Sequence, residues 1–347
     1  MNTLDTETRD RLEKQWHELT TTGLQTPGVT HDRPNPLLSA PDWYDRHRYR
    51  RAQQLSRKYF LSLNLAHFIG NILLIHLPQV IVPILATGRS STPYMVFLRI
   101  LSTTVHVLKW YEDDPFDPNS RSHRSLMQVR NTCHMAVTRL MNQKYPQSDG
   151  QLWLNQFDMA MTQWSLIGLV GIRPKQCGFH STNRQEFVEY MYFWKVIGYC
   201  MGIEDRFNIC QDNTYEESVA YFDICFKRCY KRHMDEQCPK VLMGMALTEG
   251  VFLGLNGVMP KWLFSYEGFM KYWYEALGVR KHPIQLLTLS QRLSYFMMCL
   301  TMDYLLKVSL IYTVISKLFF YYQNTLFDKI SIVKSYTDRY YGDVYYQ

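Results

Sequence analysis

The chain has 347 residues, of which 46% are hydrophobic and 15% aromatic, and its formal net charge is +7. This composition supports a large buried core and excludes a disordered chain, and the absence of a recurring basic stripe with stacking aromatics predicts no nucleic-acid partner. The eight cysteines form no Cys-x-x-Cys pair and the charged start is no signal peptide, so we expect reduced thiols on the cytosolic side.

The first segments are polar. A charged helix is predicted at 4–21, and a proline-rich linker follows at 26–43, where a helix cannot persist. The run 45–58 then holds six Lys or Arg against one Asp. A solvated helix face is one interpretation of this run, and a juxtamembrane segment is the other, because an apolar stretch follows at once.

Beyond the linker, apolar residues recur mainly at intervals of three and four, and no alternating strands are found. This pattern predicts an all-α fold with a single large helical domain at 42–325, preceded by the helix and linker of 1–41 and followed by a tail at 326–347. Three helix starts carry the capping-box pattern: Thr182 with Gln185, Thr214 with Glu217, and Thr288 with Gln291.

Two apolar segments are candidates for contact with a bilayer. Residues 59–88 contain no Asp, Glu, Lys or Arg, but a buried helix pair broken near Pro78 explains the segment equally well. Residues 304–322 are rich in aromatics, and there Lys307 and Lys317 would have to snorkel or face protein. We expect membrane association.

The first candidate site lies on the predicted helix 97–110. Arg99, Thr103 and His106 recur at i, i+4 and i+7 on one otherwise apolar face. A structural ion pair with a core histidine is the alternative explanation, because a buried arginine is costly unless it is paired.

The segment 111–123 follows, with Asp-Pro twice within five residues. Its acidic side chains could bind a cation, but the composition favours a loop that ends a helix.

A second helix begins after this loop and repeats the pattern of the first. Arg130 and His134 lie one helical turn apart on a mostly apolar face. One such histidine is more often a core residue, but two consecutive helices that each present Arg and His indicate an apolar slot for a flat cofactor such as haem.

Two further clusters are interpreted as structural. The stripe Phe187, Tyr190, Met191, Trp194, Ile197 and Met201 is predicted to be core, with the helix ending at Gly202. Cys225, Cys229 and His233 have spacing that suggests zinc, but eight residues of helix span about 12 Å, too far for the outer two to share one ion.

The order of four short pieces resembles a known family. The pieces are "RILSTT", "RSLMQVRNTCHMAV", "QFDMAMTQWSLIGLVGI" and "EFVEYMYFWKVIGYCMGIEDRFN", which together cover about a third of the chain. They resemble the catalytic domain shared by the ER-bound oxygenase of mycophenolic acid biosynthesis (mpaB) and the bacterial rubber oxygenase, or latex-clearing protein.

The resemblance implies an all-α fold that binds a b-type haem. By position, His134 matches the histidine that ligates the iron, and Arg99 and Thr103 match residues of the haem pocket. The rubber oxygenases place a lysine ligand just before that threonine, where this chain has Ser102, so His106 becomes the nearest candidate for the sixth position. No counterpart of the family's pocket glutamate is identified.

The resulting hypothesis is a haem b-dependent oxygenase that acts with dioxygen on an apolar, isoprenoid or lipid-like substrate. Arg99 and Thr103 are the predicted catalytic residues, and His134, Arg130 and His106 the predicted cofactor-binding residues, with His134 on the iron. The alternative is a non-catalytic haem- or lipid-binding protein associated with a membrane. The resemblance places the expected membrane at the endoplasmic reticulum, and the expectation of reduced thiols places the chain on its cytosolic face.

Overall fold

The computed structural model describes residues 4–29, 35–179, 183–236, 238–280 and 282–342. The chain forms two compact units whose segments alternate along the sequence. The first contains residues 1–59, 103–172 and 181–226, and the second contains residues 60–102, 173–180 and 227–347. The predicted domain boundaries at residues 41 and 325 stay a prediction.

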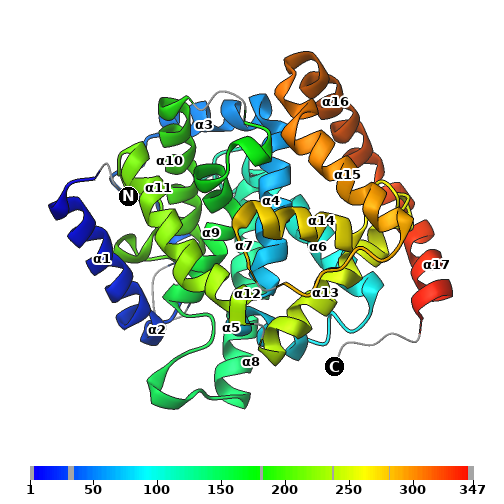
Figure 1. Cartoon of the computed structure of the whole chain (residues 1–347). Helices are drawn as coiled ribbons and strands as arrows, with labels where there is room; N and C mark the ends of the chain where they lie inside the picture. Colours follow the sequence, from blue (N-terminus) through cyan, green and yellow to red (C-terminus); the bar gives the residue numbers. More distant parts are fainter. Residues whose placement is uncertain (1–3, 30–34, 180–182, 237, 281, 343–347) are drawn as a thin grey trace. The chain divides into compact units, whose positions relative to one another are not determined.

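Both units are built from helices, which confirms the predicted all-α class (Figure 1). In the described ranges, extended pairing is limited to one isolated antiparallel bridge between Pro27 and Asn155. The helical periodicity of the sequence is therefore realised throughout the described chain.

The first unit contains most of the N-terminal half of the chain. Its elements are α1 (Thr6–Thr20), α2 (Thr22–Gln25), η1 (Pro36–Leu38), α3 (Arg46–Lys58), the end of α6 (Pro93–Trp110), α7 (Arg121–Gln128), η2 (Val129–Met135), α8 (Ala136–Lys144), η3 (Ser148–Gly150), α9 (Gln156–Ile172), α10 (Arg184–Met201), η5 (Asp205–Phe207) and α11 (Tyr215–Cys225).

The second unit contains the apolar helices and the C-terminal half. Its elements are α4 (Phe60–Ile75), α5 (Pro78–Ala86), the start of α6, η4 (Lys175–Cys177), η6 (Phe226–Lys231, whose first residue belongs to the first unit), α12 (Arg232–Glu236), α13 (Pro239–Leu255), α14 (Tyr266–Leu277), α15 (Leu289–Asp303), η7 (Leu305–Lys307), α16 (Ser309–Thr325), η8 (Phe327–Lys329) and α17 (Ile330–Tyr341).

The helix α10 supplies much of the core of the first unit. All six residues of the predicted aromatic stripe are buried: Phe187, Tyr190, Met191, Trp194, Ile197 and Met201. The helix ends at Gly202, whose φ of +101° lies in the left-handed region that glycine adopts without strain. The prediction of a core helix that stops at this glycine is confirmed.

The helix starts follow local sequence signals. Two predicted capping boxes are present, Thr214 with Glu217 and Thr288 with Gln291, each with both reciprocal hydrogen bonds. Thr182 lies outside the described residues. The first turn of α10 is instead capped by Asn183, whose side chain accepts from two backbone N–H groups.

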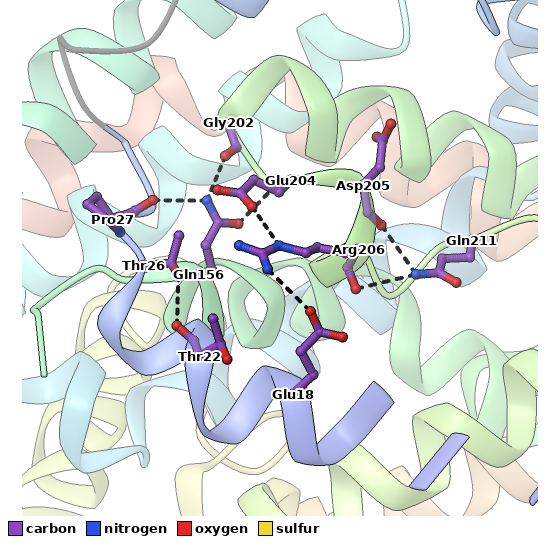
Figure 2. A network of polar contacts seen from close by, with 10 residues as sticks. All are labelled: Glu18, Thr22, Thr26, Pro27, Gln156, Gly202, Glu204, Asp205, Arg206 and Gln211. Carbon is purple, nitrogen blue, oxygen red and sulfur yellow. Dashed lines mark hydrogen bonds and ion pairs between the residues drawn. The ribbon is translucent and has the colours of Figure 1, made fainter. Parts of the chain in front are cut away.

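The predicted N-terminal helix is present as α1, and the segment after it is tied into the first unit. Gln156, fully buried at the start of α9, donates from Nε2 to the carbonyl oxygens of Pro27 and Gly202, both at 3.0 Å (Figure 2). Its Oε1 accepts the Glu204 N–H at 3.0 Å. One buried amide thus joins the N-terminal segment to α9 and to the end of α10, with its main donors and acceptor satisfied.

The basic helix α3 faces acidic residues of α10. Arg48 and Arg51 lie 3.5 and 3.3 Å from carboxylate oxygens of Glu189, and Lys58 lies 2.6 Å from Glu186. Of the two interpretations of this run, the structure supports the solvated face, because all of its Lys and Arg except Arg48 are exposed. Several of these charges also pair with carboxylates of α10, more than a hundred residues away in the chain.

The apolar segment 59–88 forms the helices α4 and α5, broken between Ile75 and Pro78. Most side chains of α4 are buried, as the interpretation of a buried helix pair expects, whereas in α5 only Ile81 and Pro83 are buried. Within the described residues, no single helix has both the length and the apolar character needed to cross a bilayer, although three pairs of helices that meet at a sharp bend meet those criteria jointly.

Candidate functional site

In the first unit, the end of α6 and the helix α7 form a hairpin. Ser125 Oγ lies 2.8 Å from His106 Nδ1 and accepts a hydrogen bond from Trp110 Nε1 at 3.1 Å. Ser122 Oγ donates to the Lys109 carbonyl oxygen at 2.6 Å. Residues earlier in α6 therefore contact residues later in α7. The two helices run antiparallel, as expected for neighbours joined by a short loop.

The loop between these helices has the structure that its Asp-Pro repeats predict. The Asp114 side chain accepts the Phe116 N–H at 3.0 Å, and the Asp117 side chain accepts the Asn119 N–H at 2.9 Å. Asp114 also pairs with Arg46 at 2.8 Å. Both carboxylates shape turns and Asp114 also pairs with one arginine of α3, so the interpretation as a loop is confirmed.

The helix after the loop changes geometry where the predicted ligand lies. Val129–Met135 forms a π-helix, with the α-helices α7 before it and α8 after it. Segments of π-helix are rare and occur frequently at functional sites, because the wider turn redirects side chains that a regular helix would aim elsewhere. The sequence periodicity predicts an uninterrupted α-helix here and gives no sign of this turn.

Three side chains along η2 and α8 each have a buried polar atom without a hydrogen-bond partner in the described part of the chain. These atoms are Arg130 Nε, His134 Nδ1 and Thr138 Oγ1. The residues are four apart, which puts them along one side of a helix. Buried polar atoms without partners are uncommon in native proteins, and three along one side of a helix mark a place where a ligand or ordered water would supply the missing hydrogen bonds.

Arg130 is the most unusual member of this stripe. Its side chain is 4% exposed, and no carboxylate pairs with it among the described residues. Its contacts are two long hydrogen bonds from Nη1, to Asn131 Oδ1 at 3.4 Å and to Met135 Sδ at 3.7 Å. A buried guanidinium that lacks an anion is costly, so an anionic partner would fit this position.

His134 is held in the neutral form. Burial, and secondarily the nearby Arg130 charge, lower its pKa from the usual value near 6.5 to about 4. The imidazole therefore keeps a lone pair available at neutral pH, as a metal ligand requires. Its Nδ1 has no hydrogen-bond partner among the described residues, so this nitrogen is available to a ligand.

The structure brings some predicted residues together and leaves others separate. Arg130 and His134 are neighbours, since the charge of one acts on the pKa of the other. His106 is half-buried and bonded to Ser125, and burial followed by the Lys109 charge lowers its pKa. Thr103 is half-buried on the same helix.

Arg99 belongs to the second unit, where its Nη2 donates to Thr87 Oγ1 at 2.7 Å. Its place in a pocket shared with His134 therefore stays a prediction. Ser102, at the position of the family's lysine, is exposed.

The sequence pattern did not identify Thr138 or Ser125 as candidate site residues. The interval of four from His134 is the signal that would have identified Thr138.

No group of three or more His, Cys, Asp or Glu side chains able to hold a metal ion occurs in the described ranges, and this includes the Cys225, Cys229 and His233 series. A haem iron needs only one protein ligand, so this test does not concern His134.

Comparison with known proteins gives one similar fold. No family model matches the chain, and no curated protein matches it. A solved structure described as latex clearing protein in the closed state aligns with a TM-score of 0.55 at 17% identity, over 94% of this chain and 85% of that chain. At this identity the similarity concerns the fold alone. It supports the rubber-oxygenase part of the predicted resemblance at that level, and nothing supports the mpaB part.

Proposed function

We propose that this protein is a haem b-dependent oxygenase that acts on an apolar, isoprenoid or lipid-like substrate. The observation that carries the proposal is the stripe of unsatisfied buried polar atoms on Arg130, His134 and Thr138. A fold shared with latex clearing protein is the second support, because that protein's name describes action on an apolar polymer.

The chemistry of these side chains fits a haem. A neutral imidazole suits ferrous or ferric iron, and His134 is neutral at pH 7. An arginine that lacks a carboxylate partner suits a haem propionate, and Arg130 is such a residue. In this proposal His134 holds the iron, Arg130 binds a propionate, and the Thr138 hydroxyl completes the polar side of the pocket.

The bound haem would supply the iron centre at which dioxygen reacts. The polypeptide would hold the cofactor, exclude water and orient an apolar substrate. His106 has its Nδ1 engaged by Ser125, so only its Nε2 is available toward a ligand. Ser102 offers no amine, so it would not supply an iron ligand as the family's lysine does. Arg99 would serve either dioxygen or a propionate.

A non-catalytic haem-binding protein is the second candidate, favoured by the missing counterpart of the family's pocket glutamate. Both candidates predict a coloured protein with a Soret band after reconstitution. They differ in oxygen uptake, which the oxygenase shows when polyprenyl compounds are added and the binding protein does not.

The test is an absorption spectrum and an oxygen-electrode trace on the purified full chain reconstituted with haem b. One haem per chain together with oxygen uptake that depends on a polyprenyl substrate supports the oxygenase. A Soret band without oxygen uptake supports the non-catalytic haem-binding protein. The absence of stoichiometric haem rejects both candidate functions.

A further inference from the structure

The helix α16, which Figure 1 places in the C-terminal part of the chain, is unusual among the long helices because none of its side chains is buried. Leu310, Val314, Leu318 and Tyr321 follow one another at intervals of four, four and three, so they share a face. Their exposed fractions are 75%, 49%, 63% and 70%. A row of four large exposed apolar side chains exceeds the single exposed residues that are normal on a soluble surface.

The opposite side of α16 rests on α4 of the same unit. Phe319 and Phe320 lie 6.2 and 5.2 Å from Phe60 between ring centroids, and the Tyr312 hydroxyl lies 3.0 Å from Ser62 Oγ. The helix is therefore anchored along one side, and the outward apolar face is a feature of the folded unit.

The charges of this region have one sign. From Tyr304 to Phe327 there is no Asp or Glu, and the charged residues are Lys307 and Lys317, both exposed. Tyr304, 67% exposed, has the Lys307 ammonium 5.7 Å from its ring centroid. Exposed Leu and Tyr with lysines and without acids are typical of helices that lie in the headgroup region of a bilayer.

We propose that the outward face of α16, with η7 before it, is a binding surface for the headgroup region of an anionic lipid bilayer. The helix lies in the plane of the interface, with Leu310, Val314 and Leu318 below the headgroups. At 17 residues it is shorter than the ~20 apolar residues that a span requires. This inference does not depend on the proposed haem chemistry.

The position of Lys317 favours a bilayer over a second protein chain. Lys317 is exposed, seven residues after Leu310 and four before Tyr321, which places it on the same helical face, so a protein partner on that face would bury its ammonium. Lysine is depleted from the cores of protein interfaces because its desolvation is costly. At a bilayer the side chain instead extends its methylenes along the apolar zone and places the charge among lipid phosphates.

The experiment is co-flotation of the full chain with vesicles of phosphatidylcholine alone and vesicles in which about a third of the lipid is phosphatidylserine. We expect flotation with the anionic vesicles. The variant Leu310→Glu/Leu318→Glu should weaken the partition at least about tenfold. Lys317→Gln should weaken it about fivefold on anionic vesicles and leave the neutral ones unaffected.

Leu38→Glu is the matched control, because Leu38 is 77% exposed in the first unit and belongs to no apolar row. It should float like the wild type. Circular dichroism melting of each variant verifies the fold, which the exposed positions should preserve. The absence of flotation by a folded wild type overturns the proposal, as does equal loss in the control. A concentration-dependent dimer that Leu318→Glu dissociates, without vesicle binding, would assign the surface to a second copy instead.

Discussion

Arg48 on α3 and Arg130 on η2 both belong to the first unit, but their charges are compensated differently. On α3, Arg48 has the Glu189 and Asp212 carboxylates within 3.5 Å and lies over the Tyr192 ring. On η2, Arg130 is more deeply buried and has no carboxylate among the described residues. A paired arginine stabilises the fold that holds it. An unpaired buried arginine costs stability, and is expected where a ligand supplies the missing charge.

The largest expected effect is on cofactor content at His134. His134→Ala should abolish stoichiometric haem binding because it removes the proposed iron ligand, whereas His106→Ala should retain much of it. The pyridine haemochromogen assay on both variants, reconstituted in parallel with the wild type, measures the difference. Equal haem content in His134→Ala and wild type would remove His134 from the site.

The comparison itself is tested by replacing each arginine with methionine. In the cofactor-free protein, Arg130→Met should raise the free energy of unfolding by about 1–3 kcal/mol, because an unpaired buried charge gives way to an apolar side chain. Arg48→Met should lower it by about 1–2 kcal/mol, since two ion pairs and a cation–π contact are lost. Urea denaturation provides both values.

The two variants should also differ in how well they retain haem. Arg130→Met should weaken haem binding, and Arg48→Met should leave it unchanged. If both variants lose stability to the same degree, then Arg130 is a structural residue and the contrast between the two helices is wrong.

Acid should destabilise the cofactor-free protein through His134. Its pKa is about 4 in the folded chain and near 6.5 in the unfolded chain, so between these values the unfolded state binds a proton that the folded state does not. The free energy of unfolding should therefore fall as the pH drops from about 6.5 toward 4 and level off below.

The buried His67 and His76, whose pKa values are lowered by burial to about 3 and about 4, act with the same sign. His134→Phe should accordingly reduce the slope without removing it. Melting temperatures recorded across this pH range in both proteins are the measurement, and an unchanged slope would argue that His134 titrates normally.

The smallest effect is expected at Thr138. Thr138→Val removes a buried hydroxyl that has no partner, so the stability of the cofactor-free protein should change by less than about 1 kcal/mol or rise slightly. Haem affinity should fall a few-fold if the hydroxyl faces the cofactor. Ser125→Ala is the control with the opposite expectation, because Ser125 bonds to both His106 and Trp110 and its loss should destabilise the fold.

Local signals in the sequence determined the helical class, the position of most helices and several of their ends. Thr214, Thr288 and Gly202 act through hydrogen bonds and dihedral angles within a few residues, so their effect can be predicted without knowing the rest of the fold. The burial of the α10 stripe follows from periodicity alone. The candidate residues Arg130 and His134 were also identified in this way.

Only the tertiary structure decided which charges have partners and which apolar faces are covered. Glu189 pairs with arginines of α3 although it lies more than a hundred residues away in the chain, and the sequence near Arg48 does not predict this ion pair. The π-helix at Val129–Met135 and the unsatisfied Thr138 hydroxyl likewise depend on packing around that turn. The apolar helices α4 and α16 look alike in composition, yet one is buried and the other is exposed. The burial of an apolar face and the pairing of a charge depend on residues distant in sequence, so a local sequence pattern cannot predict them.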